Sequence, residues 1–318
     1  MRMCMKNKII VDEIMVKVSV IMPVYNSVSS VVKMLNSLKS QTLKEFEVLM
    51  IDDGSNDGTE NILDNFAQMD QRFKAVHKQN GGVSAARQTG LDLAKGEYVI
   101  HADSDDWVDP NMLEELYINA KQNDADVVIC DFFSNTDRKQ VLVKQEPLSL
   151  APAELLNELF QQLHGSCCNK LARRVCYNKY KIRFPEGVNH CEDLLTWIQL
   201  FQHPDVKVSY LPKAFYHYYN NSDSITRNFT HNTYEMRLKY LSKLDEILSD
   251  DYRDLKQKAA FGVFTEAVMF NVLSYDEAKE GLIRFRNEIK HIESLKWKIG
   301  FFCLSMGFNR VASKLIHY

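Results

Sequence analysis

Apolar and polar residues follow two different periods along the first 133 positions. Short runs rich in apolar residues predict strands over 16–22, 47–51, 73–77, 98–102 and 126–133. Apolar residues that recur every three or four positions predict helices over 31–40, 56–69, 81–94 and 110–122. Strands and helices that alternate at this spacing are typical of βαβ units. The sequence therefore predicts an α/β fold with a Rossmann-like, mostly parallel sheet flanked by helices.

The pattern loosens after residue 133. Residues 134–150 are polar and predict a hairpin or a flexible insertion. Two further helices are predicted over 152–163 and 191–201, and two strands over 206–211 and 214–219. From about residue 229 the chain is predicted to be helical, with segments over 234–248, 252–273 and 276–289.

Three polar clusters fall where predicted strands end. They occupy residues 52–59 (DDGSNDGT), 80–87 (NGGVSAAR) and 101–107 (HADSDDW). The first strand is expected to end at Pro23, before Val-Tyr-Asn26. Ligands of parallel α/β sheets bind beyond the carboxyl ends of the strands, so we expect these clusters to share one site.

The third cluster places three carboxylates within four residues, at Asp103, Asp105 and Asp106. Carboxylates this close repel one another, and a hard divalent cation such as Mg²⁺ or Mn²⁺ would relieve the repulsion. The alternative is a solvated acidic turn in front of the helix predicted to begin at Pro110. This cluster alone leaves both interpretations open.

The other two clusters are ambiguous in the same way. Gly54 and Gly58 permit turn conformations, and the neighbouring Asp and Ser residues could simply cap the following helix. Gly81 and Gly82 could expose backbone N–H groups to an anion, with Arg87 one to two turns further on, or form an ordinary turn followed by an exposed arginine. The cluster at 80–87 matches neither a phosphate-binding P-loop nor a dinucleotide fingerprint.

Composition narrows the class of protein. The net charge of −3 over 318 residues gives no sign of a nucleic-acid partner. Seven scattered cysteines without a CxxC pair argue against a zinc site and fit a reducing cytoplasm. The first residues contain no apolar run long enough for a signal peptide or a membrane span. Residues 1–14 are expected to be a disordered leader, unless the true start is Met15.

The C-terminal segment 282–318 has a different composition. It carries seven Lys and Arg residues against two Glu, interleaved with aromatic and aliphatic residues. Such a segment suits an anionic membrane surface, although its apolar run is too short to span a bilayer. A helix packed on the rest of the chain, or a contact in a homodimer, would explain the apolar residues equally well.

The order and spacing of the clusters are more specific than any one of them. Val18–Asn26 (VSVIMPVYN), DDGSNDGT, NGGVSAAR and DSDD together resemble the family 2 glycosyltransferases of the GT-A fold, over about residues 16–228. The resemblance implies a nucleotide-binding half over 16–133 and an acceptor half over 134–228. A leader over 1–15 would precede this catalytic domain, and a helical region over 229–318 would follow it.

The resemblance also implies a site for a UDP-sugar donor. Tyr25 would pack against the base, Asp53 would accept a hydrogen bond from the uracil N3–H, and Asp103 would face the ribose. Arg87 would lie near the base or the diphosphate. The full set of residues implied for this site is Pro23, Tyr25, Asn26, Asp53, Arg87, Asp103, Ser104, Ser224 and Arg227.

A bound Mn²⁺ or Mg²⁺ is implied as cofactor. Asp105 would bind it, and Asp106 would support the loop. Some relatives use a histidine as a further ligand, and His217 in Phe-Tyr-His-Tyr-Tyr219 occupies a comparable place. A histidine among aromatic residues is as readily explained as a packed strand residue. Ser224 and Arg227 would contact phosphate from the following segment.

The second half supplies residues implied to act on the acceptor. Asp193 would take the proton from the acceptor hydroxyl, so that one direct displacement inverts the anomeric configuration, and Glu192 would orient the acceptor or support Asp193. An isolated Glu-Asp pair is otherwise a favourable start for a helix. Trp107 and His164 are implied to contact the acceptor, although Trp107 could equally be a core aromatic.

The resemblance predicts a cytoplasmic enzyme, peripheral at the inner face of the plasma membrane. It would move a hexose or N-acetylhexosamine from UDP to a glycan or lipid-linked acceptor in surface polysaccharide biosynthesis. A sugar-phosphate nucleotidyltransferase would carry a glycine-rich loop after the first strand, where this chain has Pro23-Val-Tyr-Asn26. A non-catalytic glycan-binding relative would not be expected to keep both Asp105 and Asp193.

Overall fold

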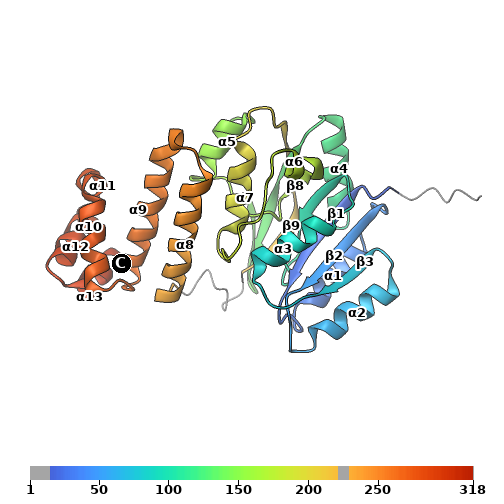
Figure 1. Ribbon diagram of the computed structural model, residues 1–318, viewed down its shortest axis with the longest axis horizontal. Helices are drawn as coiled ribbons and strands as arrows, with labels where there is room; N and C mark the ends of the chain where they lie inside the picture. The colour runs from blue at the N-terminus through green and yellow to red at the C-terminus, as the bar shows by residue number, and fades with distance from the viewer. Residues whose placement is uncertain (1–14, 221–228, 318) are drawn as a thin grey trace, which may run out of the picture.

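A computed structural model of the chain describes residues 15–220 and 229–317. The predicted leader up to residue 14, and the predicted phosphate contacts Ser224 and Arg227, lie outside the described residues. Within the described residues one mixed sheet of nine strands forms the centre of the fold, with helices on both of its faces (Figure 1).

Four strands within residues 18–101 form the parallel part of the sheet, in the order β3-β2-β1-β4. Each strand runs toward the same edge, and each is followed by one of the predicted polar clusters or by the loop at Tyr25. The bounds are β1 Val18–Val24, β2 Phe46–Asp52, β3 Phe73–His77 and β4 Tyr98–His101.

The chain after β4 extends the sheet with strands of mixed direction. β8 runs antiparallel to both β4 and β6, and β9 runs parallel to β6. β5 pairs antiparallel with β9, and β7 pairs antiparallel with β6. The bounds are β5 Trp107–Val108, β6 Val127–Asn135, β7 Gln140–Val143, β8 Lys170–Arg173 and β9 Val208–Tyr219.

The two faces of the sheet carry separate apolar cores. Alternate residues of β1 point to opposite faces, as the period of a strand requires: Val20 and Met22 join one core, and Ile21 joins the other. On the first face pack α1 Val31–Lys39, α2 Thr59–Met69 and α4 Met112–Gln122. On the second pack α3 Val83–Leu93, α5 Pro152–Glu158, α6 Arg174–Lys179 and α7 Glu192–Phe201.

The C-terminal helices form a third core that extends away from the sheet (Figure 1). α8 packs on α7, α9 packs on α8, and the last four helices cover α9. None of the described helices is both long and apolar enough to cross a membrane. The bounds are α8 His231–Ile247, α9 Arg253–Met269, α10 Tyr275–Arg284, α11 Arg286–His291, α12 Leu295–Ser305 and α13 Asn309–His317, with a 3₁₀ turn at Asp250–Tyr252.

Two sequence predictions about strands are wrong in detail. β1 does not end before Pro23, because it continues beside β2 to Val24. The position tolerates proline because the pairing of β1 with β4 stops at Ile21, so no strand needs the missing N–H. The two strands predicted over 206–211 and 214–219 are the single strand β9, whose pairing with β6 shifts register between Leu211 and Ala214.

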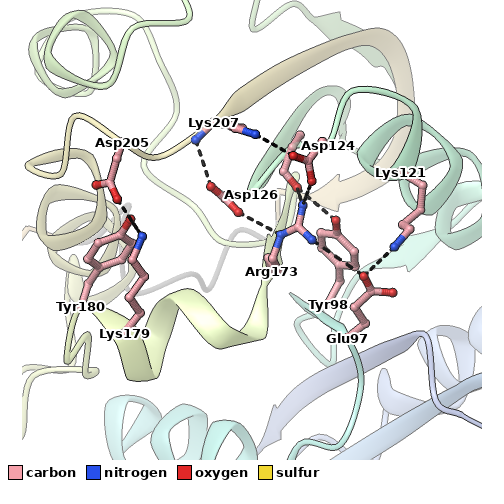
Figure 2. Close-up of polar contacts among 11 residues, drawn as sticks. Glu97, Tyr98, Lys121, Asp124, Asp126, Arg173, Lys179, Tyr180, Asp205 and Lys207 are labelled. Carbon is pink, nitrogen blue, oxygen red and sulfur yellow. Dashed lines mark hydrogen bonds and ion pairs between the residues drawn. The ribbon is translucent and has the colours of Figure 1, made fainter.

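The end of the sheet away from the polar clusters is held by a network of ion pairs around Arg173 (Figure 2). The guanidinium donates to Asp126 at 2.8 Å and to Asp124 at 3.0 Å, and its Nη1 lies 3.8 Å from Glu97. Lys207 pairs with Asp124 at 2.6 Å. These contacts join the turn before β6 to the end of β8, so they stabilise the sheet where the two halves of the domain meet.

Candidate functional site

A cavity of about 940 Å³ opens at the carboxyl ends of β1, β2 and β4. All but one of the described donor-site residues predicted from the sequence line it, together with the predicted metal ligand Asp105. These residues are Pro23, Tyr25, Asn26, Asp53, Asp103, Ser104 and Asp105. The remaining described donor-site residue, Arg87, is buried beside the cavity.

The loop after β1 is fixed by the loop after β2. Asn26 has a left-handed backbone (φ 47°), a conformation that asparagine tolerates better than most residues. Its backbone N–H donates to Ser55 Oγ at 2.9 Å, and its side-chain oxygen accepts from the backbone N–H of Asn56 at 2.9 Å. This arrangement leaves Tyr25 52% exposed at the cavity, with a ring free to stack on a flat ligand.

Asp53 binds the glycine pair that the sequence suggested for an external anion. Its Oδ1 accepts from Lys78 Nζ at 2.6 Å and from the Gly81 N–H at 3.0 Å, and its Oδ2 accepts from the Gly82 N–H at 2.7 Å. The anion bound by Gly81 and Gly82 is therefore a carboxylate of the protein itself. Two lone pairs on each oxygen leave one acceptor position on Oδ2, which suffices for one donor of a ligand.

The carboxylates of the acidic loop after β4 have different surroundings: one anchors the loop, and two line the cavity. Asp106 is buried and accepts from Tyr216 Oη and from the Tyr219 N–H, both at 2.6 Å, so it anchors the loop to β9 as predicted. Asp103 and Asp105 line the cavity. Burial and the negative charge of Asp103 raise the pKa of Asp105. A bound cation would relieve the part of this shift that comes from Asp103. Among the described residues, however, no three His, Cys, Asp or Glu side chains are grouped so that they could hold a metal ion.

Arg87 links the two halves of the domain. Its Nη2 donates to Asp103 at 2.8 Å, and its Nη1 donates to Glu192, which lies 105 positions further along the chain. Burial lowers the pKa of Arg87, but the charges of Asp103, Glu192 and Asp193 outweigh burial and raise that pKa. The guanidinium is therefore permanently charged, and it holds the carboxylates of Asp103 and Glu192 together.

Glu192 and Asp193 occupy the first turn of α7, where the helix dipole favours carboxylates. A left-handed residue, Cys191 (φ 61°), turns the chain into this helix. Burial raises the pKa of Asp193, and Arg87 opposes that rise. Asp193 Oδ1 accepts the N–H of Leu194 at 2.9 Å. Asp103 also raises the pKa of Asp193, so the carboxylates of the two halves interact.

A buried lysine that the sequence did not indicate holds a loop that contacts this helix. Lys170 is fully buried, and its Nζ donates to the His164 carbonyl at 2.5 Å, the Ser166 carbonyl at 2.9 Å and Asn169 Oδ1 at 2.9 Å. Trp197 of α7 donates to the same Ser166 carbonyl at 3.1 Å. His164, predicted to contact the acceptor, thus lies in a loop that Lys170 holds against α7, and its carbonyl accepts one of the hydrogen bonds from Lys170.

Trp107 and His217 form a stack instead of facing the cavity. Their rings lie 4.9 Å apart and nearly parallel, and the Lys33 ammonium covers the Trp107 ring at 2.9 Å from its centre. His217 donates or accepts at both ring nitrogens, with Asp109 at 3.1 Å and Gln140 at 3.0 Å. Trp107 has no free face for a sugar in this arrangement. A metal on His217 would have to replace one of its two protein partners.

Several cavity residues were missed by the sequence predictions. Their common feature is that they come from distant segments: Lys33 from α1, Asn189 from the loop before α7, Met236 from α8, and Asp137 and Tyr219 from the far edge of the sheet. No motif marks these positions. Asn189 packs so closely on Gly82 that a Cβ there would lie 2.2 Å from its side-chain oxygen.

The chain is similar in sequence to known glycosyltransferases. The model of the family described as glycosyl transferase family 2 matches residues 19–181. A cholesterol galactosyltransferase of Borreliella burgdorferi is 32% identical over 322 aligned positions, covering 93% of this chain and 89% of that protein. EpsH of Bacillus subtilis, named as a glycosyltransferase, is 31% identical over 229 positions, which cover 70% of this chain and 66% of EpsH.

The fold is also similar to a solved structure. TarS of Staphylococcus aureus, in complex with UDP-GlcNAc, superposes with a TM-score of 0.68 at 20% sequence identity. The match covers 95% of this chain and 90% of that structure, so it includes the C-terminal helices as well as the sheet. The arrangement of the whole described chain is therefore one that a known GT-A glycosyltransferase also adopts.

Proposed function

The chain belongs to glycosyltransferase family 2, and from this premise we propose that it transfers a sugar from a UDP-sugar to a glycan or lipid-linked acceptor in surface polysaccharide biosynthesis. The observation that carries the proposal is the bridge from Asp103 through Arg87 to Glu192. Asp103, on the side proposed to bind the donor, and Glu192, next to the proposed base Asp193, contact the same guanidinium. TarS, of similar fold, has been crystallised with UDP-GlcNAc, which supports a UDP-linked hexose or N-acetylhexosamine as donor.

The nucleotide is proposed to bind in the cavity between the first two loops. Tyr25 would stack on the uracil, and the free acceptor position of Asp53 would receive the uracil N3–H. Asn26 and Pro23 would line the nucleoside pocket, and Asp103, with Ser104, would face the ribose. The hydrogen bonds that already fix Asn26 and Asp53 make the pocket preformed, which lowers the entropic cost of binding.

Asp105 is proposed to hold Mn²⁺ or Mg²⁺. When bound, the ion would offset the negative charge that develops on the departing nucleotide diphosphate. The pKa of Asp105 is raised first by burial and then by the negative charge of Asp103, and a cation would relieve the second of these causes. We leave His217 out of this proposed site, since both of its ring nitrogens have protein partners.

Asp193 is proposed to act as the general base. Its carboxylate would take the proton of the acceptor hydroxyl while that oxygen forms a bond to the anomeric carbon and the bond from this carbon to the diphosphate breaks. One displacement of this kind inverts the configuration. A raised pKa makes a carboxylate a stronger base once it is deprotonated, which suits this role. Glu192 and Arg87 would position Asp193.

The transfer is proposed to take place in the cytoplasm, at the inner face of the plasma membrane. A lipid-linked acceptor is supported by the relative that covers 93% of this chain, whose name states a lipid, cholesterol, as its acceptor. A homodimer remains a prediction from the composition of residues 282–318.

Release of UDP from a panel of UDP-hexoses and UDP-N-acetylhexosamines, with GDP-mannose for comparison, tests the proposed donor. We expect one UDP-sugar to be hydrolysed or transferred fastest. EDTA should suppress the reaction, and added Mn²⁺ or Mg²⁺ should restore it. Faster turnover of GDP-mannose would refute the assignment of UDP. Full activity in EDTA would refute the assignment of a metal to Asp105.

A further inference from the structure

We propose that α12 and the groove beside it bind the surface of an anionic membrane through a face that is separate from the sugar-transfer site. The four helices α10 to α13 form the end of the molecule farthest from β1, β2 and β3 (Figure 1). The inference rests on the side chains of these helices alone, and it holds whether or not the cavity above transfers a sugar.

α12 is apolar on two opposite faces, although only one of them is needed for packing. Its inner face is buried: the Phe301 ring lies 6.1 Å from that of Phe264 in α9, and Gly300 lies against Ile316 of α13. On its outer face, apolar residues recur at intervals of four, three and four positions, so they form one stripe along the helix. That stripe is exposed: Leu295 70%, Ile299 43%, Phe302 66% and Met306 60%.

A groove of about 530 Å³ lies between α12 and the helices α10 and α11, and Phe302 is the residue of the stripe that lines it. Most of its lining residues are apolar, and they include Ile283, which is 69% exposed, and Phe302. Two cations, Arg286 and Lys298, also line it, and no acidic side chain is among the residues that line it in the described part of the chain. The full lining is Leu282, Ile283, Arg286, Ile289, Lys298, Phe301, Phe302 and Ser305.

The charge of this region favours a membrane over a second copy of the chain. A symmetric dimer through the stripe would bring each Arg286 and Lys298 near the same residues of the other copy, and like charges repel. An anionic bilayer offers an apolar interior for Phe302 and Ile283 and phosphate groups for the two cations. The wider segment 282–318, with seven Lys and Arg against two Glu, carries the same excess of positive charge.

Co-sedimentation with vesicles tests the proposal without any sugar donor, so its result is independent of the proposed function. The full chain is mixed with vesicles of phosphatidylcholine alone or of phosphatidylcholine and phosphatidylglycerol in equal parts. We expect binding to the mixed vesicles and little to the neutral ones, with the difference reduced at high salt. Equal binding to both kinds of vesicle, or to neither, would overturn the proposal.

Two variants separate the charged and apolar contributions. Arg286→Gln with Lys298→Gln should weaken binding to the mixed vesicles about 30-fold, since each cation near an anionic surface contributes about fivefold. The matched control, Lys39→Gln with Lys95→Gln, also removes two positive charges but leaves the groove intact. If both pairs of substitutions weaken binding equally, net charge and not this groove is responsible.

Phe302→Glu should weaken binding about tenfold, because it replaces an apolar group that would enter the bilayer with a charge. Met69→Glu is the control: Met69 is 72% exposed, but it lies on α2 of the catalytic domain. Both residues are exposed, so unchanged thermal midpoints are expected. Sedimentation velocity should show one species for wild type and Phe302→Glu. A dimer that Phe302→Glu dissociates would show that a second copy covers α12.

Discussion

Each end of the central sheet has an arginine that holds several carboxylates, and the surroundings of these two arginines differ. At one end, the three acidic residues around Arg173, which are Glu97, Asp124 and Asp126, are matched by Arg173 and two lysines, Lys121 and Lys207 (Figure 2). Paired charges of this kind need no further partner, and the residues at this end serve to hold strands together.

At the other end, Arg87 is surrounded by carboxylates that outnumber the nearby cations. Asp103 and Glu192 contact it directly, and Asp193 lies close enough to raise its pKa. Asp105 follows on the same loop as Asp103. Negative charge left uncompensated inside a protein is unfavourable, and it is retained where a ligand supplies the missing positive charge. The contrast thus supports the proposal that the end of the sheet at Arg87 is the functional one.

The largest effect is expected from removing the proposed base. Asp193→Asn should reduce kcat about 10³-fold, within the usual range for loss of a general base, while calorimetry shows unchanged affinity for UDP. Asp126→Asn, at the Arg173 end, should leave kcat unchanged. Undiminished turnover of Asp193→Asn would remove Asp193 from the mechanism, and a comparable loss in Asp126→Asn would erase the distinction between the two ends.

The two arginines should differ in their contribution to the free energy of unfolding. Arg87→Met leaves buried carboxylates without their partner and should cost about 3 kcal/mol. Arg173→Met removes partly exposed pairs and should cost about 1 kcal/mol. Urea unfolding at neutral pH measures both values. An equal loss of unfolding free energy for the two substitutions would show that the ion pairs of Arg87 stabilise the fold no more than those of the partly exposed Arg173.

The proposed metal ligand should give a somewhat smaller effect. Asp105→Asn is expected to lower kcat/KM about 10²-fold at limiting Mn²⁺, since one charged ligand is lost from the proposed site. Part of the loss should be recovered as the Mn²⁺ concentration rises. Asp124→Asn is the control, because its carboxylate pairs with Lys207 and Arg173 at the opposite end. A loss that is the same at every Mn²⁺ concentration would argue against metal binding.

The smallest effect concerns pH. Burial raises the pKa values of Asp105 and Asp193 above those of the unfolded chain, so the native state binds more protons, and stability from these groups falls as pH rises above about 4. Burial alone would raise the pKa of Glu97 as well, but Lys121 and Tyr117 outweigh burial and lower it. The stability that Glu97 contributes is therefore lost only as pH falls through its depressed pKa.

Unfolding with and without Mn²⁺ separates these two contributions. The ion should stabilise the protein more at about pH 8 than at about pH 5, by about 1 kcal/mol, because protons compete for the carboxylates at the lower pH. Asp105→Asn should abolish this difference, and Glu97→Gln should preserve it. An effect of Mn²⁺ that is independent of pH would place the ion elsewhere.

The local pattern of apolar and polar residues was sufficient to predict most strands of the sheet and the helices that follow them. The strand over 73–77 and the helix from Val31 were predicted correctly because apolar periodicity and turn residues act over a few positions. β5 has only two residues and therefore no period to detect. α12 is apolar on both faces, so it lacks the one-sided pattern by which a surface helix is recognised.

The candidate site was predictable in its composition but not in its internal contacts. The three clusters do converge on one cavity, since the carboxyl ends of parallel strands meet at one edge. The sequence could not show that Asp53 takes up the Gly81 and Gly82 N–H groups, or that Arg87 reaches Glu192 across 105 positions. Such contacts depend on how distant loops pack, which no short-range pattern records.

The contact of Arg87 with carboxylates from both halves constrains how this domain can be recombined. A chimera that takes residues up to β6 from one relative and the remainder from another keeps this salt bridge only if both parents carry an arginine and a glutamate at these two places. Exchanging the acceptor half to change specificity should therefore fail in folding before it fails in catalysis, unless the arginine and its two carboxylates are transplanted as one unit.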